Sequence, residues 1–125
     1  MTASARTEQL LSSMLRKKLF VALRKVEAGE KIQQYLEAHL EWMIAAEKRG
    51  HIFASGPIVN DDGGPHSLGG LTLVRAESLS EAHDIIGQDP FIKQDVFSAD
   101  LYEWQVMEGK ITIELNFHDR SFGLN

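Results

Sequence analysis

The sequence predicts a single small α+β domain of the ferredoxin-like type, a βαββαβ sandwich with an antiparallel sheet and an extra C-terminal strand. Two observations favour this fold class. The length of 125 residues suits one domain. The order of strand and helix patterns is that of a split βαβ sandwich. The first and third strands are apolar on both faces, which concerns the pairing of the sheet, because two helices cover only one face of a four-stranded sheet.

The expected strands are short runs rich in β-branched, aromatic and other apolar residues. They span residues 18–26, 51–59, 68–76, 100–107 and 111–115. Pro57 lacks a backbone N–H, so the end of the second strand is expected at a sheet edge or a bulge. Residues 60–65 read NDDGGP, a turn cluster that predicts a hairpin between the second and third strands.

Residues 30–49 are predicted to form the first helix, because apolar residues recur there with a helical period. The stripe consists of Ile32, Leu36, His39, Met43 and Ala46. Gly50 stands where a helix commonly ends.

The second helix, 78–87, is expected to begin at a capping sequence. Ser78 or Ser80 is the predicted cap, with Glu81 as its partner. Asp89 precedes a proline and therefore predicts a turn, because the residue before proline avoids the helical region. A short helical turn is expected before the fourth strand.

Apolar residues on both faces of the first strand indicate a partner for the sheet. Leu19, Val21 and Leu23 alternate there with Phe20 and Ala22. An antiparallel sheet with one hydrated face would alternate apolar with polar residues, and a large exposed apolar face is unfavourable. We therefore expect a homodimer that pairs through the sheet face. A monomer whose open sheet face binds a ligand is the alternative.

The two ends of the chain are expected to lie outside the sandwich. Residues 1–16 are assigned to an N-terminal extension, either an amphipathic helix or a frayed segment. Residues 17–115 are assigned to the domain. Residues 116–125 show no periodicity and are expected to form a tail that is mobile or wraps around the partner subunit.

Composition narrows the function classes. The chain has 13 basic and 18 acidic residues, a net charge of −5, so no basic face for nucleic acid is expected. No apolar run approaches the roughly 20 residues that a membrane span requires, and a cytoplasmic location is expected because no secretory segment is visible. The absence of cysteine excludes thiolate chemistry. The five histidines lack metal-ligand spacing, so no metal is expected. The glycine pairs at 63–64 and 69–70 lack the lysine and following helix of a phosphate loop, so no nucleotide is expected, and no other cofactor is expected either.

His39 is the main candidate catalytic residue, because it falls within the apolar stripe of the first helix. A buried imidazole without a hydrogen-bond partner costs about 1–3 kcal/mol. His39 is either a general acid or base tuned by a carboxylate, or a core histidine bonded to a backbone carbonyl, which the pattern alone favours. Asp89 is either a turn former before proline or the carboxylate that orients His39.

Five further residues are candidates for substrate binding. Ser55 is a potential donor to a substrate oxygen, with Gly56 beside it; the alternative is that these small residues admit close helix packing. Phe91 and Trp104, together with Phe97, offer an aromatic wall for a flat ring, although aromatic residues at these spacings are more often core.

Short motifs in a fixed order support a family resemblance. The matching pieces are the strand 18–24, Ala38-His39-Leu40, Gly50, Ser55-Gly56-Pro57-Ile58, Asp61-Asp62-Gly63, Gly69-Gly70, Ser80-Glu81-Ala82, Asp89-Pro90-Phe91 and the strand with Trp104. Each piece is common alone. Their order over residues 18–107 resembles the YCII-related (YciI-like) domain family, a branch of the dimeric α+β barrel superfamily.

This resemblance implies a sheet-to-sheet dimer and a pocket for a small molecule centred on His39 and Asp89. Some family members are linked to elimination on chlorinated hydroquinones, and neighbouring families isomerise lactones or oxidise aromatic rings. The implied function is acid–base catalysis of elimination or isomerisation on a cyclic or aromatic metabolite. A non-catalytic binding or accessory domain and a cofactor-free monooxygenase are the alternatives. Residues 25–28 lack the acidic, proline-containing segment that many members carry, which affects one wall of the pocket.

Overall fold

The computed structural model describes residues 4–61 and 68–124. The chain divides into two compact units, Lys18–Gln105 and the terminal segments Met1–Lys17 with Val106–Asn125. Most of the turn predicted at 60–65 falls outside the described residues. None of the described helices is long and apolar enough to cross a membrane.

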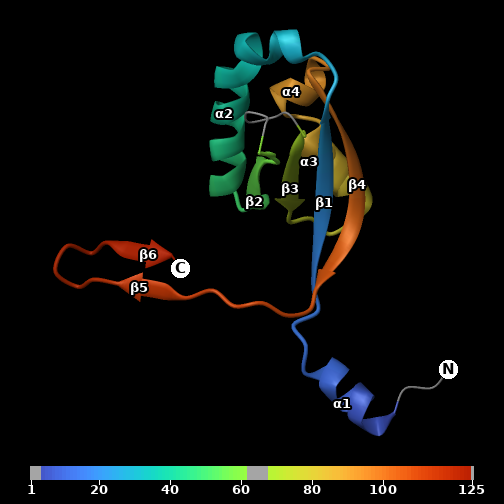
Figure 1. Cartoon of the computed structure of the whole chain (residues 1–125), viewed down its shortest axis with the longest axis vertical. Helices are drawn as coiled ribbons and strands as arrows, with labels where there is room; N and C mark the ends of the chain where they lie inside the picture. The colour runs from blue at the N-terminus through green and yellow to red at the C-terminus, as the bar shows by residue number, and fades with distance from the viewer. Residues whose placement is uncertain (1–3, 62–67, 125) are drawn as a thin grey trace. The chain divides into compact units, whose positions relative to one another are not determined.

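The larger unit is built on a four-stranded sheet with the order β2-β3-β1-β4 (Figure 1). The central strands β1 (Lys17–Val26) and β3 (Gly70–Val74) pair antiparallel. β2 (Ile52–Pro57) pairs antiparallel with β3 at one edge, and β4 (Phe97–Val106) lies beside β1 at the other. Pro57 therefore ends an edge strand, as predicted. This strand order confirms the α+β, ferredoxin-like βαββαβ fold class.

Three helices among the described residues connect the strands of this sheet. α2 (Ile32–Lys48) is entered through a 3₁₀ turn, Gly29–Lys31, and is followed by Gly50 with a φ of +84°, the left-handed conformation expected after a helix. α3 (Leu79–Ile86) and the short α4 (Pro90–Lys93) lie between β3 and β4.

α3 begins at the predicted capping sequence. The hydroxyl of Ser78 accepts from the backbone N–H of Glu81 at 3.1 Å. The Glu81 carboxylate accepts in turn from the N–H of Glu77 at 3.1 Å. The cap thus satisfies two backbone donors at the start of the helix.

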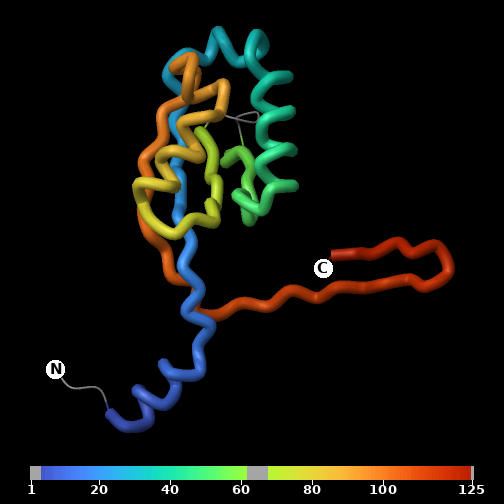
Figure 2. The backbone as a smooth tube through the Cα atoms, turned by 180° about the vertical axis from the view of Figure 1, so that it is seen from behind, coloured from blue at the N-terminus to red at the C-terminus, as the bar shows by residue number. Residues whose placement is uncertain are grey.

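One face of the sheet shares a core with α2 and α3. The buried residues of this cluster are Phe20, Ala22, Ala46, Ile52, Val74, Ala82, Ile85, Ile86 and Leu101. A second cluster joins α4 to the start of β4 and packs against the first turns of α2; its buried members are Phe91, Val96 and Phe97. All four strands contribute to the first cluster, so α2 and α3 cover the same face (Figure 2).

The opposite face of the sheet keeps large apolar side chains exposed. Leu23 faces Leu71 across β1 and β3 and is 42% exposed. Tyr102 and Trp104, which alternate along β4 with the buried Leu101, are 56% and 44% exposed. The central strands therefore carry apolar residues on both faces, as the sequence predicts.

The start of β4 differs from the prediction. The strand begins at Phe97 rather than at residue 100. Asp95, two residues after α4, has a φ of +55°, a left-handed conformation that does not continue a helix. The strand then starts by burying Phe97 against α4.

The terminal unit contains the extra C-terminal strand, β5 (Ile113–Leu115). It pairs antiparallel with β6 (Phe122–Leu124) in a separate two-stranded sheet. β6 was not predicted, because residues 116–125 show no alternation. The same unit holds α1 (Ala5–Ser12), which is capped by the hydroxyl of Ser4. The helical interpretation of the N-terminal segment is therefore correct.

Candidate active site

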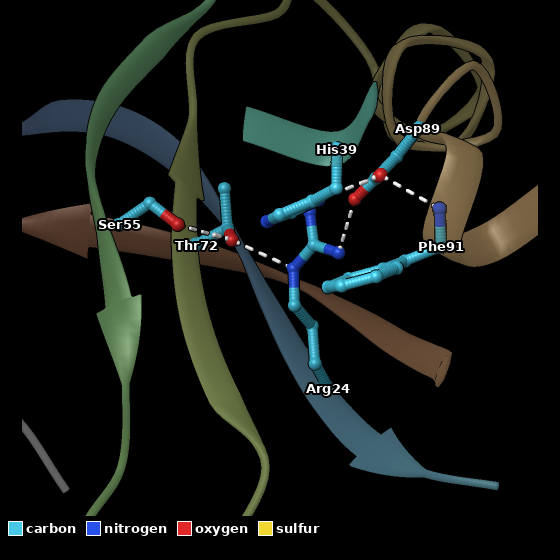
Figure 3. Close-up of polar contacts among 6 residues, drawn as sticks. All are labelled: Arg24, His39, Ser55, Thr72, Asp89 and Phe91. Atoms are coloured by element: carbon cyan, nitrogen blue, oxygen red, sulfur yellow. Dashed lines mark hydrogen bonds and ion pairs between the residues drawn. The ribbon is translucent and has the colours of Figure 1, made fainter. Parts of the chain in front are cut away.

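His39 on α2 contacts Asp89, which follows α3. The distance between Nδ1 of His39 and Oδ1 of Asp89 is 2.8 Å, and their side chains are 12% and 0% exposed. An ionised carboxylate only accepts, so the proton of this bond belongs to Nδ1, and Nε2 of the neutral ring carries a lone pair. In Figure 3 this second ring nitrogen lies on the side of Ser55 and Thr72.

Asp89 is held in place by the turn that the sequence predicts. Its backbone is extended, with φ −64° and ψ 127°, and it caps α4 just before Pro90. Oδ1 also accepts from the backbone N–H of Phe91 at 2.9 Å. Asp89 is therefore both a turn former and the hydrogen-bond partner of His39, so the two interpretations are compatible.

Arg24 on β1 is the third member of the cluster. Its Nη1 donates to Oδ2 of Asp89 at 2.5 Å, and its Nε donates to Oγ1 of Thr72 at 2.8 Å (Figure 3). The Arg24 side chain is only 6% exposed. Among the described residues Nη2 is buried without a hydrogen-bond partner. A buried guanidinium requires a counter-charge, and Asp89 supplies it.

These contacts decide the charge of Asp89. Burial by itself would raise the pKa of this carboxyl. The hydrogen bond with His39, the positive charge of Arg24 and the bond from the Phe91 N–H act in the other direction and hold the pKa below its ordinary value of 3.8. Asp89 is therefore an anion at neutral pH and fixes the proton of His39 on Nδ1.

The polar cluster continues from Thr72 on β3 to Ser55 on β2. Their hydroxyl oxygens are 2.8 Å apart. Direct contacts thus join the edge strand to α2 through Thr72, Arg24 and Asp89. The network couples the orientation of Ser55 to that of His39.

A cavity of about 300 Å³ opens beside this network, a size at the lower end for small-molecule sites. Its walls are mostly apolar, with a few polar groups. The lining residues are Arg24, Leu36, His39, Leu40, Met43, Ser55, Gly56, Pro57, Gly69, Gly70, Phe91 and Phe97. This combination suits a small ring with polar substituents.

Phe91 fixes the plane of the histidine ring. The ring centroids of His39 and Phe91 are 4.1 Å apart with an interplanar angle of 10°, a stacked arrangement. Phe97 lies 5.0 Å from Phe91 on a tilted plane. The stacked pair leaves the ring edges of His39, where its nitrogens lie, for hydrogen bonding.

Two glycines at the cavity, Gly69 and Gly70, allow close packing of neighbouring backbone. Gly69 has a φ of +83°, and a Cβ there would lie 1.9 Å from the carbonyl oxygen of Arg24. A Cβ at Gly70 would lie 3.2 Å from the carbonyl oxygen of Gly56. The backbone of Arg24 on β1 and of Gly56 at the end of β2 therefore approaches these glycines closely, and at Gly69 it excludes any side chain.

The structure brings together most residues that the sequence singles out. His39, Ser55, Gly56 and Phe91 line the cavity. Asp89 lies behind this wall and is hydrogen-bonded to His39. Trp104 is not among the described lining residues and alternates onto the other face of the sheet. Its role in substrate binding stays a prediction. Residues 25–28, which depart from the family pattern, do not line the cavity either.

Sequence reasoning missed Arg24 and Thr72. The position of Arg24 in β1 is the signal. Every second residue of a strand faces the same side, so Arg24 lies on the core-facing side with Phe20 and Ala22. A charged residue at a core position needs a buried partner. Thr72 likewise alternates with Val74 on the core-facing side of β3. Within the described parts of the chain, no group of three or more His, Asp or Glu residues is placed to hold a metal ion.

Comparisons with known proteins agree with this fold. Residues 17–105 match the model of the YCII-related domain. One similar solved structure is 5-chloro-2-hydroxyhydroquinone dehydrochlorinase (TftG) from Burkholderia phenoliruptrix AC1100, in complex with 2,5-dihydroxybenzoquinone. It is 25% identical, with a TM-score of 0.55, over 69% of this chain and 92% of that one. No curated protein sequence matches.

The family match spans well over half of the chain and coincides with the unit that holds the cavity. The chain therefore belongs to the YCII-related domain family. Its βαββαβ sandwich is the subunit fold of the dimeric α+β barrel superfamily.

Proposed function

We propose that this protein is a small-molecule enzyme in which His39 and Asp89 catalyse elimination or isomerisation on a hydroxylated cyclic or aromatic compound. The observation that carries the proposal is the 2.8 Å contact between Asp89 and Nδ1 of His39, at the wall of a cavity of ring size. The likeness to a dehydrochlorinase that acts on a hydroquinone supports the reaction class.

In this proposal Nε2 of His39 is the group that moves protons. Asp89 keeps the neutral ring in the tautomer with a lone pair on Nε2, and it stabilises the imidazolium that forms when Nε2 takes a proton. Phe91 holds the ring plane. No oxidant is needed for either an elimination or an isomerisation of this kind.

For a chlorinated hydroquinone the balanced reaction is loss of one HCl. Nε2 takes the proton of the hydroxyl next to the C–Cl carbon and delivers it to that carbon, which gives a ketone tautomer. Nε2 then removes the proton of the hydroxyl para to this ketone. The oxygen electrons form the second carbonyl and expel chloride, and the product is a quinone. The electron pair of the broken C–Cl bond leaves with chloride, and His39 passes the second proton to water.

The test uses the purified chain with 5-chloro-2-hydroxyhydroquinone. We expect enzyme-dependent release of chloride, and deuterium incorporation at ring carbon when the reaction is run in D₂O. Chloride release is measured with an ion-selective electrode and deuterium by mass spectrometry. If neither occurs although 2,5-dihydroxybenzoquinone binds, the catalytic proposal is wrong and the non-catalytic binding domain takes its place.

We further propose that two copies pair through the exposed sheet face. Leu23, Tyr102 and Trp104 support this, because large apolar side chains clustered on one face commonly mark an interface. Light scattering at micromolar concentration is expected to give about twice the subunit mass of 14.0 kDa. The mass of a single subunit would contradict the dimer. A cytoplasmic location likewise stays a prediction, to be checked by cell fractionation.

A further inference from the structure

The contact between Arg24 and Thr72 has a fixed direction. A guanidinium has only donors, so Nε of Arg24 donates and Oγ1 of Thr72 accepts in the 2.8 Å bond between them. Arg24 is itself anchored by the ion pair with Asp89. The hydroxyl hydrogen of Thr72 must therefore be directed elsewhere.

The acceptor for that hydrogen is Ser55. Thr72 is 0% exposed, so water does not reach its hydroxyl. Among the described residues, Thr72 Oγ1 has one hydrogen-bond contact besides Arg24, to Oγ of Ser55 at 2.8 Å. If Ser55 donated instead, a buried O–H would be left unsatisfied, which is unfavourable. The arrangement that satisfies every group has Thr72 donating to Ser55.

The hydrogen of the Ser55 hydroxyl then has no acceptor among the described residues, and Ser55 lines the cavity. We propose that Arg24 and Thr72 fix the Ser55 hydroxyl as a hydrogen-bond donor into the cavity. The site would accordingly take a ring with an oxygen acceptor, a carbonyl or a phenolate, at the Ser55 end. This inference rests on the proposed function, because it names the substrate class of the same cavity.

The same guanidinium orders both polar ends of the cavity. Through Asp89 the guanidinium fixes the tautomer of His39. Through Thr72 it fixes the Ser55 hydroxyl as an acceptor from Thr72 and a donor toward the cavity. Removal of a proton from a hydroxylated ring by His39 places negative charge on ring oxygens. A donor whose direction is already set stabilises such an oxygen without reorganisation. Ser55 is thus a binding residue, and Thr72 and Arg24 are positioning residues.

The test compares binding of two ring probes by calorimetry. 2,5-Dihydroxybenzoquinone presents oxygen acceptors, whereas 1,4-phenylenediamine presents mainly donors. We expect Ser55→Ala to weaken binding of the quinone about 10- to 100-fold, the usual effect of losing a hydrogen bond to a charged acceptor. Binding of the diamine is expected to stay within about twofold.

Thr72 provides the second comparison. Thr72→Val keeps the side-chain shape but removes the hydroxyl, so binding of the quinone should weaken several-fold. Thr72→Ser restores the hydroxyl and should restore the affinity. A purely structural role of Thr72 would lower the melting temperature of Thr72→Val and leave the affinity unchanged. Should Thr72→Val fail to fold, Ser55→Ala alone still decides, because Ser55 is not buried.

Unchanged quinone affinity in Ser55→Ala, or no binding to the unaltered protein, would overturn the inference. Failure of the proposed function has a different signature. If quinone binding depends on Ser55 but no proton transfer or chloride release occurs, the inference holds and catalysis does not. If turnover occurs while Ser55→Ala binds normally, catalysis holds and the inference does not.

Discussion

Replacement of His39 by alanine is expected to lower kcat about 100- to 10,000-fold, the usual contribution of a positioned general acid or base. The variant removes Nε2 and leaves the apolar walls and Ser55 in place. Binding of 2,5-dihydroxybenzoquinone should therefore change much less than kcat. Steady-state kinetics and calorimetry on the same preparations separate the two effects.

The matched control is His83→Ala. His83 lies exposed on α3 and does not line the cavity, so its loss should leave kcat unchanged. Asp89→Asn is expected to lower kcat as well, because an amide does not enforce the same tautomer. Full activity of both His39→Ala and Asp89→Asn would remove the dyad from the mechanism.

Replacement of Arg24 by methionine is expected to reduce the free energy of unfolding by about 3–5 kcal/mol. The change leaves the Asp89 carboxylate, which is 0% exposed, without its cation. Removing one partner of a buried ion pair typically lowers the free energy of unfolding by about 3–5 kcal/mol, because the remaining charge is buried without a counter-charge. Urea denaturation followed by circular dichroism measures the loss.

Two comparisons isolate the role of the ion pair. Arg49→Met removes an exposed arginine and should cost less than about 1 kcal/mol. The double variant Arg24→Met/Asp89→Asn should be more stable than Arg24→Met alone, since it leaves no buried charge unpaired. A loss below about 1 kcal/mol in Arg24→Met would contradict the geometry of the pair.

The pH dependence of stability provides a second readout of the same pair. The pKa of Asp89 is lowered in the folded state, so its contribution is fully present above the pKa of the unfolded chain, about 4. The contribution is lost as the pH falls from there through the folded pKa. Asp89→Asn is therefore expected to flatten the stability profile below about pH 4.

The sequence predicts most of the fold because its signals are local and strong. The period of residues 30–49, the cap at Ser78 and the turn before Pro90 all appear as expected. The start of β4 was misplaced because the left-handed residue Asp95 is not a glycine and gives no turn signal. β6 was missed because so short a strand gives no periodic signal.

The candidate site was predictable only in part. His39 stood out because an imidazole within an apolar stripe needs a partner, and Asp89 because it caps a turn nearby. Their contact depends on how α2 packs beside α4, which no local pattern encodes. Arg24 gives no local signal of a site, because only its alternation with Phe20 and Ala22 along β1 places its charge on the core side.

The most direct test of the central claim is the position of the proton on His39. Two-bond ¹H–¹⁵N correlation NMR on the ¹⁵N-labelled protein reports which ring nitrogen carries hydrogen in the neutral state. We predict that Nδ1 is protonated, bonded to Asp89, and that Nε2 is free and shifts when 2,5-dihydroxybenzoquinone binds. A neutral His39 protonated on Nε2, or a ring insensitive to the quinone, would contradict the proposed active site.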